Sequence, residues 1–173
     1  KETLKEGVKD ATALVSLLST NVDKDVIDSG KNLKIITNYG AGFNNVDVDY
    51  AREKDIDVTN TPKASTNATA DLTIGLILSV ARRIVEGDEL SRTKGFDGWA
   101  PLFFRGREVS GKTIGIIGLG EIGGAVAKRA RAFDMDVLYT GPHRKEEKER
   151  EIGAKYVDLD TLLENADFIT INA

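Results

Sequence analysis

Cysteine is absent from this sequence of 173 residues, and histidine and tryptophan occur once each. A chain without cysteine has neither a disulfide framework nor a thiol nucleophile, and a single histidine cannot assemble a histidine-rich metal site. We therefore expect no metal centre of that kind. The lack of cysteine is typical of a reducing compartment, so we expect a cytoplasmic protein.

An excess of either charge is also missing, since 24 Lys and Arg residues face 28 Asp and Glu residues. The charges are spread along the chain without a basic stripe, so we expect no nucleic-acid partner. The longest apolar stretch, near Leu72–Ala81, is far shorter than the roughly 20 residues of a membrane span. The opening residues 1–7 are too charged for a signal peptide, and no membrane association is expected.

The chain begins at Lys1 without an initiator methionine and stops at Ala173, just after the apolar run Phe168–Ile171. We therefore expect it to be a piece of a longer protein.

Strand-like and helix-like runs alternate along the chain, which predicts α/β layers with a largely parallel sheet. The predicted strands are 13–18, 33–37, 57–60, 113–117, 136–140, 155–157 and 167–172. The predicted helices are 24–29, 48–54, 67–94, 122–132, 145–152 and 160–165. Thr66 or Asn67 can cap the long helix, and residues 95–111 are interrupted by glycine and proline.

Two of the predicted helices have informative patterns. In the long helix, Leu72, Leu76, Val80 and Ile84 recur at i, i+4 spacing and form one apolar face. The charged run 144–151 is interpreted as a solvated helix with i, i+4 charge pairs.

Gly118, Gly120 and Gly123 form the pattern G-x-G-x-x-G between the predicted strand 113–117 and the predicted helix 122–132. This is the context of a dinucleotide-binding loop, in which the first glycine makes the turn, the second admits the pyrophosphate and the third lets the helix pack closely. The N-terminus of the helix would hold the phosphates. A lone motif could equally be a glycine-rich turn, but its flanking elements favour a cofactor site.

The end of the next strand bears on the choice of nucleotide. NAD-specific sites place an acidic residue there for the ribose 2′-hydroxyl, whereas here the position is taken by Gly141. His143, Arg144 and Lys145 follow, and Arg144 could offer a planar donor fork to a 2′-phosphate. We predict NADP(H), with NAD(H) as the alternative if these three residues only begin a solvated helix.

Three segments carry a resemblance to a known family: residues 38–47 (NYGAGFNNVD), residues 60–83, and Trp99 through Gly124. In order and spacing they resemble the D-isomer-specific 2-hydroxyacid dehydrogenases, particularly the glyoxylate/hydroxypyruvate reductase branch. The resemblance implies two lobes with a cleft between them, a nicotinamide cofactor on the second lobe, and hydride exchange with a small 2-keto or 2-hydroxy acid. It also implies a homodimer, for which the apolar face of the long helix and the arm 95–111 are suited.

The implied fold is an incomplete Rossmann-type parallel sheet preceded by a smaller flavodoxin-like α/β substrate lobe. The expected division is 1–66 for the substrate lobe, 67–111 for a linking helix and dimerisation arm, and 112–173 for the first half of the dinucleotide-binding domain.

The resemblance also implies roles for single residues. Ala41 and Gly42 would offer N–H groups to the substrate carboxylate, although the same loop could be an ordinary turn that needs positive φ. Trp99 would reach the partner's substrate site, or else plug a loop. Thr69 would contact the cofactor, or else lie in the first helical turn without a ligand. The predicted cofactor-binding residues are Thr69, Gly118, Gly120, Glu121, Ile122, Gly123, Thr140, His143, Arg144, Lys145 and Asn172.

The family's catalytic Arg, Glu and His lie beyond the last strand of this chain, so we expect no catalytic residue in it. His143 directly follows a strand on the adenosine side and is not assigned to catalysis. A nucleotide-sensing co-repressor of the same fold is the alternative function, because fold alone does not separate the two.

Overall fold

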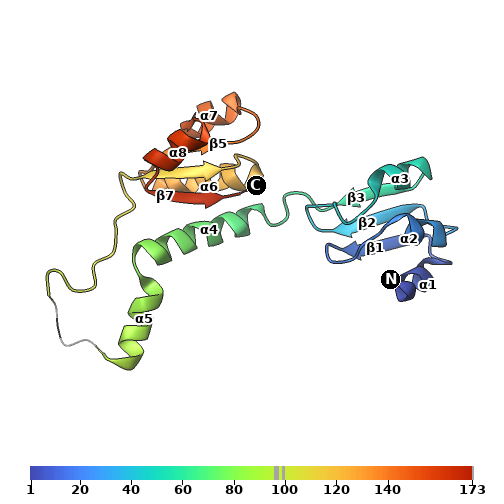
Figure 1. Ribbon diagram of the computed structural model, residues 1–173, viewed down its shortest axis with the longest axis horizontal. Helices are drawn as coiled ribbons and strands as arrows, with labels where there is room; N and C mark the ends of the chain where they lie inside the picture. Colours follow the sequence, from blue (N-terminus) through green and yellow to red (C-terminus); the bar gives the residue numbers. More distant parts are fainter. Residues whose placement is uncertain (96–97, 99, 173) are drawn as a thin grey trace. The chain divides into compact units, whose positions relative to one another are not determined.

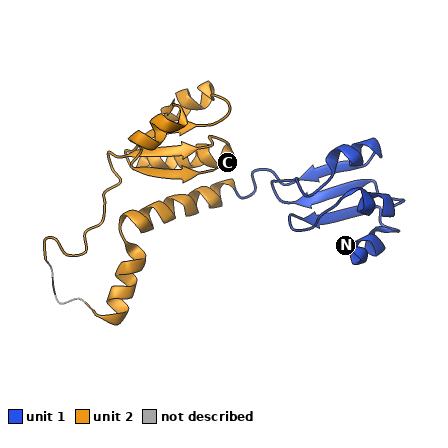
Figure 2. Ribbon diagram, in the orientation of Figure 1, with its two compact units in different colours: residues 1–65 blue, residues 66–173 orange. Residues whose placement is uncertain are grey.

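A computed structural model describes residues 1–95, 98 and 100–172, and it divides into two compact units, Lys1–Ser65 and Thr66–Ala173 (Figure 2). Each unit contains a parallel sheet with helices packed against it (Figure 1). The α/β architecture predicted from the alternating pattern is therefore confirmed.

The first unit has the strand order β1-β2-β3. Its elements are α1 (Glu2–Val8), β1 (Ala13–Leu17), α2 (Lys24–Ser29), β2 (Ile35–Tyr39), α3 (Val48–Glu53) and β3 (Asp57–Asn60). Val26 and Ile36 are fully buried in its core. Two helices begin at aspartate caps, because Asp23 accepts a hydrogen bond from the N–H of Val26 and Asp47 accepts one from the N–H of Tyr50.

The second unit has the parallel order β6-β5-β4-β7, which is the order of the first four strands of a Rossmann sheet. Its elements are α4 (Thr66–Ala81), α5 (Ile84–Thr93), β4 (Thr113–Ile117), α6 (Glu121–Ala132), β5 (Asp136–Thr140), α7 (Glu146–Ile152), β6 (Ala154–Tyr156), α8 (Leu159–Asn165) and β7 (Phe168–Ile171).

Helices α6 and α8 cover opposite faces of this sheet. A Cβ on Gly115 would lie 2.5 Å from the side chain of Leu162 in α8, whereas Ile116 approaches Gly123 in α6. Successive residues of a strand point to opposite faces. The apolar core beneath α6 includes the fully buried Ile114 and Ile116.

The single long helix predicted for 67–94 is wrong, because α4 ends at Ala81 and α5 begins at Ile84. Arg83 between them has a left-handed φ of 56°. The carbonyl of Ala81 accepts a hydrogen bond from the N–H of Arg107 at 2.6 Å, in place of a bond from the next helical turn. A contact between residues distant in sequence therefore ends the helix, and neither glycine nor proline marks the position.

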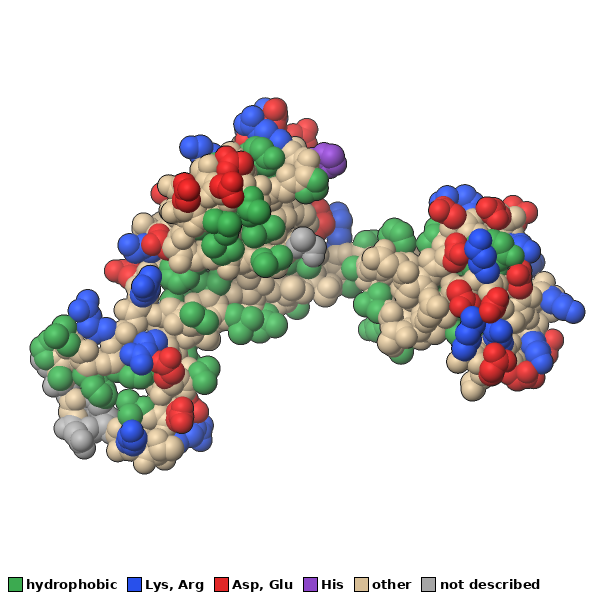
Figure 3. Space-filling model, viewed as in Figure 1, with side chains coloured by type: hydrophobic (Ala, Val, Ile, Leu, Met, Phe, Trp, Pro, Cys, Tyr) green, Lys and Arg blue, Asp and Glu red, His purple; other side chains and the backbone are tan. Residues whose placement is uncertain are grey.

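The apolar row predicted on the long helix is exposed within this chain. Leu72, Leu76 and Val80 are 63%, 58% and 76% exposed, and hydrophobic side chains are visible along α4 in Figure 3. The buried face of α4 consists of other residues, including Ala70 and Ile74, and it packs on the core under α6.

Further differences from the sequence prediction concern charged segments. Helix α1 is missing from the prediction, because its sequence is mostly polar and only Val8 is buried. In the run 144–151, two of the ion pairs join different elements: Lys148 pairs with Glu121, and Glu151 with Lys128. The predicted i, i+4 pairs within this helix are not formed among the residues described. No helix in the described part of the chain is long and apolar enough to cross a membrane.

Candidate functional site

The glycine loop joins the end of β4 to the start of α6. Gly118 has a φ of 95°, in the left-handed region that favours glycine. A Cβ on Gly123 would lie 2.0 Å from the carbonyl oxygen of Gly118, so the close packing of helix on loop requires glycine there. A Cβ on Gly120 would meet no atom within 4 Å. The loop therefore leaves open space over Gly120, directly at the N-terminus of α6, which fits a bound phosphate group.

The first turn of α6 is anchored by α7. The ammonium of Lys148 donates to the carbonyl of Gly120 at 2.9 Å and pairs with the carboxylate of Glu121 at 3.2 Å. Ile122 is half-buried and packs against the core. Lys148, which is not part of the glycine motif, thus holds the helix N-terminus that would bind the pyrophosphate.

Gly118, Thr140 and Asn172, three of the predicted cofactor residues, lie at the ends of β4, β5 and β7 at the carboxyl edge of the sheet. The N–H of Gly118 donates to the carbonyl of Thr140 at 2.9 Å, and the N–H of Asn172 donates to that of Ile117 at 2.8 Å. Since β5 and β7 both pair with β4, the ends of these three strands are neighbours. Ligands of open parallel sheets bind at this edge.

Two residues that the sequence prediction did not identify shape the loop after β5. The hydroxyl of the buried Tyr139 accepts a hydrogen bond from the N–H of Lys145 and donates to the carboxylate of Glu149, both at 2.7 Å. Arg144 binds the same carboxylate through Nε and Nη2, at 2.9 Å each. His143 is exposed at the loop surface.

This network shifts the ionisation of its members. The bidentate bond from Arg144, with help from the Tyr139 hydroxyl, lowers the pKa of Glu149 to about 2. The same pair raises the pKa of Arg144, and burial raises the pKa of Tyr139. Glu149 is thus charged at neutral pH and occupies one edge of the guanidinium, while no residue in the described part of the chain bonds the Nη1 group on the other edge.

Thr69 lies near the start of α4 and is half-buried. Its carbonyl accepts from the hydroxyl of Thr73 at 2.8 Å, whereas its own hydroxyl has no partner among the residues described. A free hydroxyl at this position is compatible with the predicted cofactor contact.

The loop after β2 contains Ala41 and Gly42, the residues predicted to face a substrate carboxylate. Both are exposed, and their N–H groups have no hydrogen-bond partner among the residues described. The alternative of a turn that needs positive φ is wrong, because neither Gly40 nor Gly42 has a positive φ. Gly40 instead allows a close approach, since a Cβ there would lie 2.5 Å from the side chain of Leu18.

Trp99, the third predicted substrate residue, lies outside the described residues. Among those that are described, no group of three or more His, Asp or Glu residues is arranged to hold a metal ion.

The residues that sequence reasoning missed have weak signals in the sequence. Tyr139 is one position of an ordinary buried strand, and Glu149 is one of several acidic residues in a charged helix. Their spacing of ten residues corresponds to no local motif, and only the return of α7 over the end of β5 brings them together.

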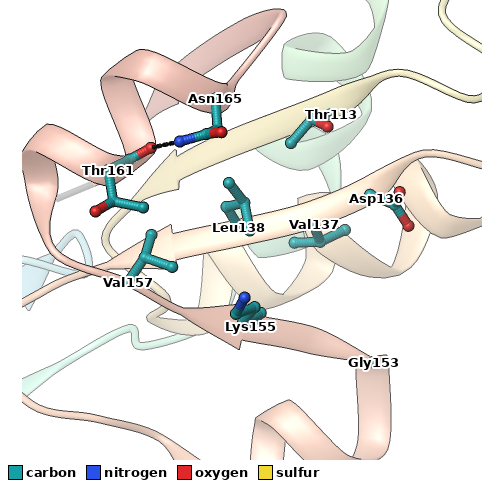
Figure 4. Close-up of a pocket in the computed structure, with 9 residues that line it drawn as sticks. All are labelled: Thr113, Asp136, Val137, Leu138, Gly153, Lys155, Val157, Thr161 and Asn165. Carbon is teal, nitrogen blue, oxygen red and sulfur yellow. Dashed lines mark hydrogen bonds between the residues drawn. The ribbon is translucent and has the colours of Figure 1, made fainter.

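A separate pocket of about 410 Å³ lies between α8 and strands β4, β5 and β6 (Figure 4). Its lining residues are Thr113, Asp136, Val137, Leu138, Gly153, Lys155, Val157, Thr161 and Asn165. None of the predicted site residues lines it. Leu138 pairs with Gly115, which faces α8, so the pocket is on the sheet face opposite α6. This pocket is not the predicted dinucleotide site.

Comparison with known proteins identifies relatives over the whole chain. A protein of Staphylococcus aureus (strain MRSA252) named "putative 2-hydroxyacid dehydrogenase" is 89% identical over 173 residues, which are 100% of this chain and 55% of that protein. The chain therefore spans about half the length of the curated relatives it matches.

Solved structures that are similar to this chain also cover nearly all of it. A protein of Thermus thermophilus is 39% identical with a TM-score of 0.90, over 99% of this chain and 54% of that one. A glyoxylate reductase from Paecilomyes thermophila is 36% identical with a TM-score of 0.82, over 99% and 53%.

Two more distant structures hold nucleotides. The Aquifex aeolicus D-lactate dehydrogenase, complexed with NAD and lactic acid, is 28% identical, with a TM-score of 0.85 over 98% of this chain and 50% of that one. An acyclic imino acid reductase in complex with NADPH and D-Arg is also 28% identical, with a TM-score of 0.84 over 99% and 54%.

The sequence model of one family, described as the NAD-binding domain of D-isomer specific 2-hydroxyacid dehydrogenases, matches residues 74–173. The chain belongs to the family of D-isomer specific 2-hydroxyacid dehydrogenases.

Proposed function

We propose that the protein of which this chain is part is a nicotinamide-dependent oxidoreductase that exchanges a hydride with a small 2-keto or 2-hydroxy acid. The observation that carries the proposal is the glycine loop, which leaves open space over Gly120 at the N-terminus of α6 and at the carboxyl edge of a Rossmann-type sheet. The family match over residues 74–173 supports the same conclusion.

The roles we assign to this chain are binding roles. Gly118, Gly120 and Gly123 shape the loop, and the N–H groups at the start of α6 bind the pyrophosphate. Glu121, Ile122, Thr140 and Asn172 surround that loop, and Thr69 contributes its hydroxyl, which bonds none of the described residues. When bound, the nicotinamide supplies or accepts the hydride.

We propose NADP(H) as the preferred nucleotide, with NAD(H) as the alternative. The strand β5 ends at Thr140 without an acidic residue, and His143, Arg144 and Lys145 follow it. The Nη1 group of Arg144 can bind a 2′-phosphate while Glu149 holds the other edge of the guanidinium. Among the structural neighbours both NAD and NADPH are found.

The substrate we propose is a 2-keto acid of the glyoxylate or hydroxypyruvate type, supported by the likeness to a glyoxylate reductase. The exposed N–H groups of Ala41 and Gly42 would bind its carboxylate. No residue of this chain is proposed as the proton donor, and we place the catalytic Arg, Glu and His in the rest of the protein. Nothing in the comparisons favours the co-repressor alternative.

We further propose a cytoplasmic homodimer. Leu72, Leu76 and Val80 form the exposed row on α4, and Ile84 and Val85 at the start of α5 are also 53% and 73% exposed. A second copy of the chain would remove this apolar surface from water. Substituting Leu76 and Val80 by Asp in the full-length protein is expected to give a monomer in sedimentation experiments.

The direct test is turnover by the full-length protein. Glyoxylate and hydroxypyruvate are offered with NADPH and with NADH, and oxidation of the nucleotide is followed by absorbance. We expect turnover with both acids and a larger kcat/KM with NADPH. Nucleotide binding without turnover of any 2-keto acid would overturn the proposal.

A further inference from the structure

In the loop from Gly40 to Asn45, the carbonyl groups of residues 40–43 are bonded within the protein, whereas the N–H groups of residues 41–43 bond none of the described residues. The carbonyl of Gly40 accepts from the N–H of Thr61 at 3.0 Å, and the carbonyl of Phe43 accepts from the N–H of Val46 at 3.0 Å. The two carbonyls between them are also occupied, by side chains from β2 and β3. Four successive carbonyl groups are therefore held by the protein.

Those two side chains are asparagines. The amide of Asn60 donates to the carbonyl of Ala41 at 2.8 Å, and the amide of Asn38 donates to the carbonyl of Gly42 at 2.8 Å. Asn60 is the last residue of β3 and Asn38 belongs to β2, so both are carried by paired strands of the sheet.

The side chain of Asn38 is held by several hydrogen bonds. It is fully buried, accepts from the hydroxyl of Ser16 at 2.8 Å, and exchanges two amide hydrogen bonds of 3.0 and 3.1 Å with Asn45. The amide nitrogen of Asn45 also lies 3.1 and 2.8 Å from the carbonyls of Leu17 and Thr20, so its two hydrogens are shared among three acceptors. A fully satisfied buried polar network of this kind rigidifies the backbone to which it is bonded.

The N–H groups at the centre of this loop differ from its carbonyl groups. The N–H groups of Ala41, Gly42 and Phe43 have no hydrogen-bond partner among the described residues, and these three residues are exposed. Because these carbonyls already accept hydrogen bonds from the protein, the successive N–H groups are left for an external acceptor. Such an arrangement suits a carboxylate, which accepts several hydrogen bonds and donates none when ionised.

We propose that Asn38 and Asn60 are positioning residues of the substrate site. By holding the carbonyls of Gly42 and Ala41, they keep the N–H groups of residues 41–43 oriented toward the carboxylate of a 2-keto acid. The inference rests on the proposed function. It adds a physical reason why the N–H groups of residues 41–43 keep their orientation. Neither side chain needs to touch the substrate.

The test uses the full-length enzyme with Asn60→Ala and Asn38→Ala. We expect each substitution to raise the KM and the dissociation constant for glyoxylate about tenfold, because the loop loses one fixing hydrogen bond and the donors lose their alignment. The kcat should change less than about threefold, since the loss affects binding rather than the reacting atoms. The dissociation constant for NADPH should stay the same and also reports that the variant is folded.

Asn44→Ala is the matched control, because Asn44 is an exposed asparagine of the same loop whose side chain bonds no described residue. It should leave the glyoxylate constants unchanged. Asn60→Gln keeps an amide donor and should recover part of the loss. If the buried Asn38→Ala variant does not fold, Asn60→Ala decides the question.

The outcomes separate the inference from the proposed function. Binding of glyoxylate without its reduction by the unaltered protein would overturn the proposed function, while the ratio of dissociation constants would still test the two asparagines. Unchanged glyoxylate binding in Asn60→Ala would overturn the inference alone. Absence of glyoxylate binding to the unaltered protein would overturn both.

Discussion

The loop after β2 and the loop after β4 both follow a parallel strand and both expose backbone donors, but they are built differently. After β2, asparagine side chains hold the carbonyls and neither glycine has positive φ. After β4, Gly118 has positive φ and Gly123 touches the backbone of Gly118.

The difference shows two physical ways in which a loop after a parallel strand can be fixed. One relies on side-chain hydrogen bonds, so substitution of an asparagine should loosen it. The other relies on the absence of Cβ atoms, so an added methyl group should disrupt it. The predictions below test this contrast.

The largest effect is expected for Gly123→Ala. The added Cβ would lie 2.0 Å from the carbonyl oxygen of Gly118, a backbone atom that cannot move without shifting the loop. Although alanine favours helix more than glycine does, we expect the free energy of unfolding to fall by about 3 kcal/mol. Urea denaturation of the full-length protein measures it.

Gly42→Ala is the matched control in the other loop. Its Cβ would have a first neighbour only at 4.0 Å, on Leu18, so the free energy of unfolding should change by less than about 0.5 kcal/mol. Equal losses in Gly123→Ala and Gly42→Ala would break the contrast between the loops.

Gly120→Val should separate binding from folding. The space over Gly120 is open, so the variant should fold with a thermal midpoint close to that of the unaltered protein. A branched side chain would occupy the position predicted for the pyrophosphate, and nucleotide affinity should fall at least about 100-fold. Calorimetric titration with NADPH measures the affinity, and tight binding by a folded variant would show that the glycine has no role in binding.

Arg144→Glu should change the choice of nucleotide. Each charge-assisted hydrogen bond contributes ~1.5–3 kcal/mol, so kcat/KM for NADPH should fall roughly 10–100-fold while that for NADH changes little. Arg150→Glu makes the same change of charge on the exposed side of α7 and is the control. An unaltered enzyme with a larger kcat/KM for NADH than for NADPH would contradict the NADP(H) assignment.

The smallest effect concerns acid stability. Since the pKa of Glu149 is lowered to about 2 in the folded protein, the carboxylate stabilises the fold above its ordinary pKa near 4.5, and this contribution is lost as the pH falls toward 2. Glu149→Gln should therefore show a shallower loss of stability between these pH values than the unaltered protein. Glu147→Gln removes a charge from the same helix and should not change that slope.

The first strands of the Rossmann-type sheet are predictable because β4 and β5 are short, mostly apolar runs bounded by turn residues. The strands 57–60, 113–117 and 136–140 were predicted with the observed bounds. Local patterns could not reveal the break after Ala81, because the hydrogen bond from Arg107 that ends α4 joins segments far apart in sequence. Helix α1 was missed because it buries a single residue.

The candidate site likewise has some residues that a local pattern identifies and others that it does not. Gly118, Gly120 and Gly123 are recognisable because their spacing reflects a local requirement of a strand, a turn and a helix. Tyr139 with Glu149 was not recognisable, nor was Asn38 with Asn60, because each pair depends on strands and helices that meet only after folding.

The hydrogen bond between Arg107 and Ala81 has a consequence for how this protein can diversify. Close by, Gly106 packs against the carbonyl of Ala81, where a Cβ would lie 2.6 Å away. The two ends of the segment that contains α5 are therefore held together, at Ala81 on one side and at Gly106 and Arg107 on the other. A segment with fixed ends can be lengthened, shortened or exchanged between relatives without disturbing the sheet from which it departs.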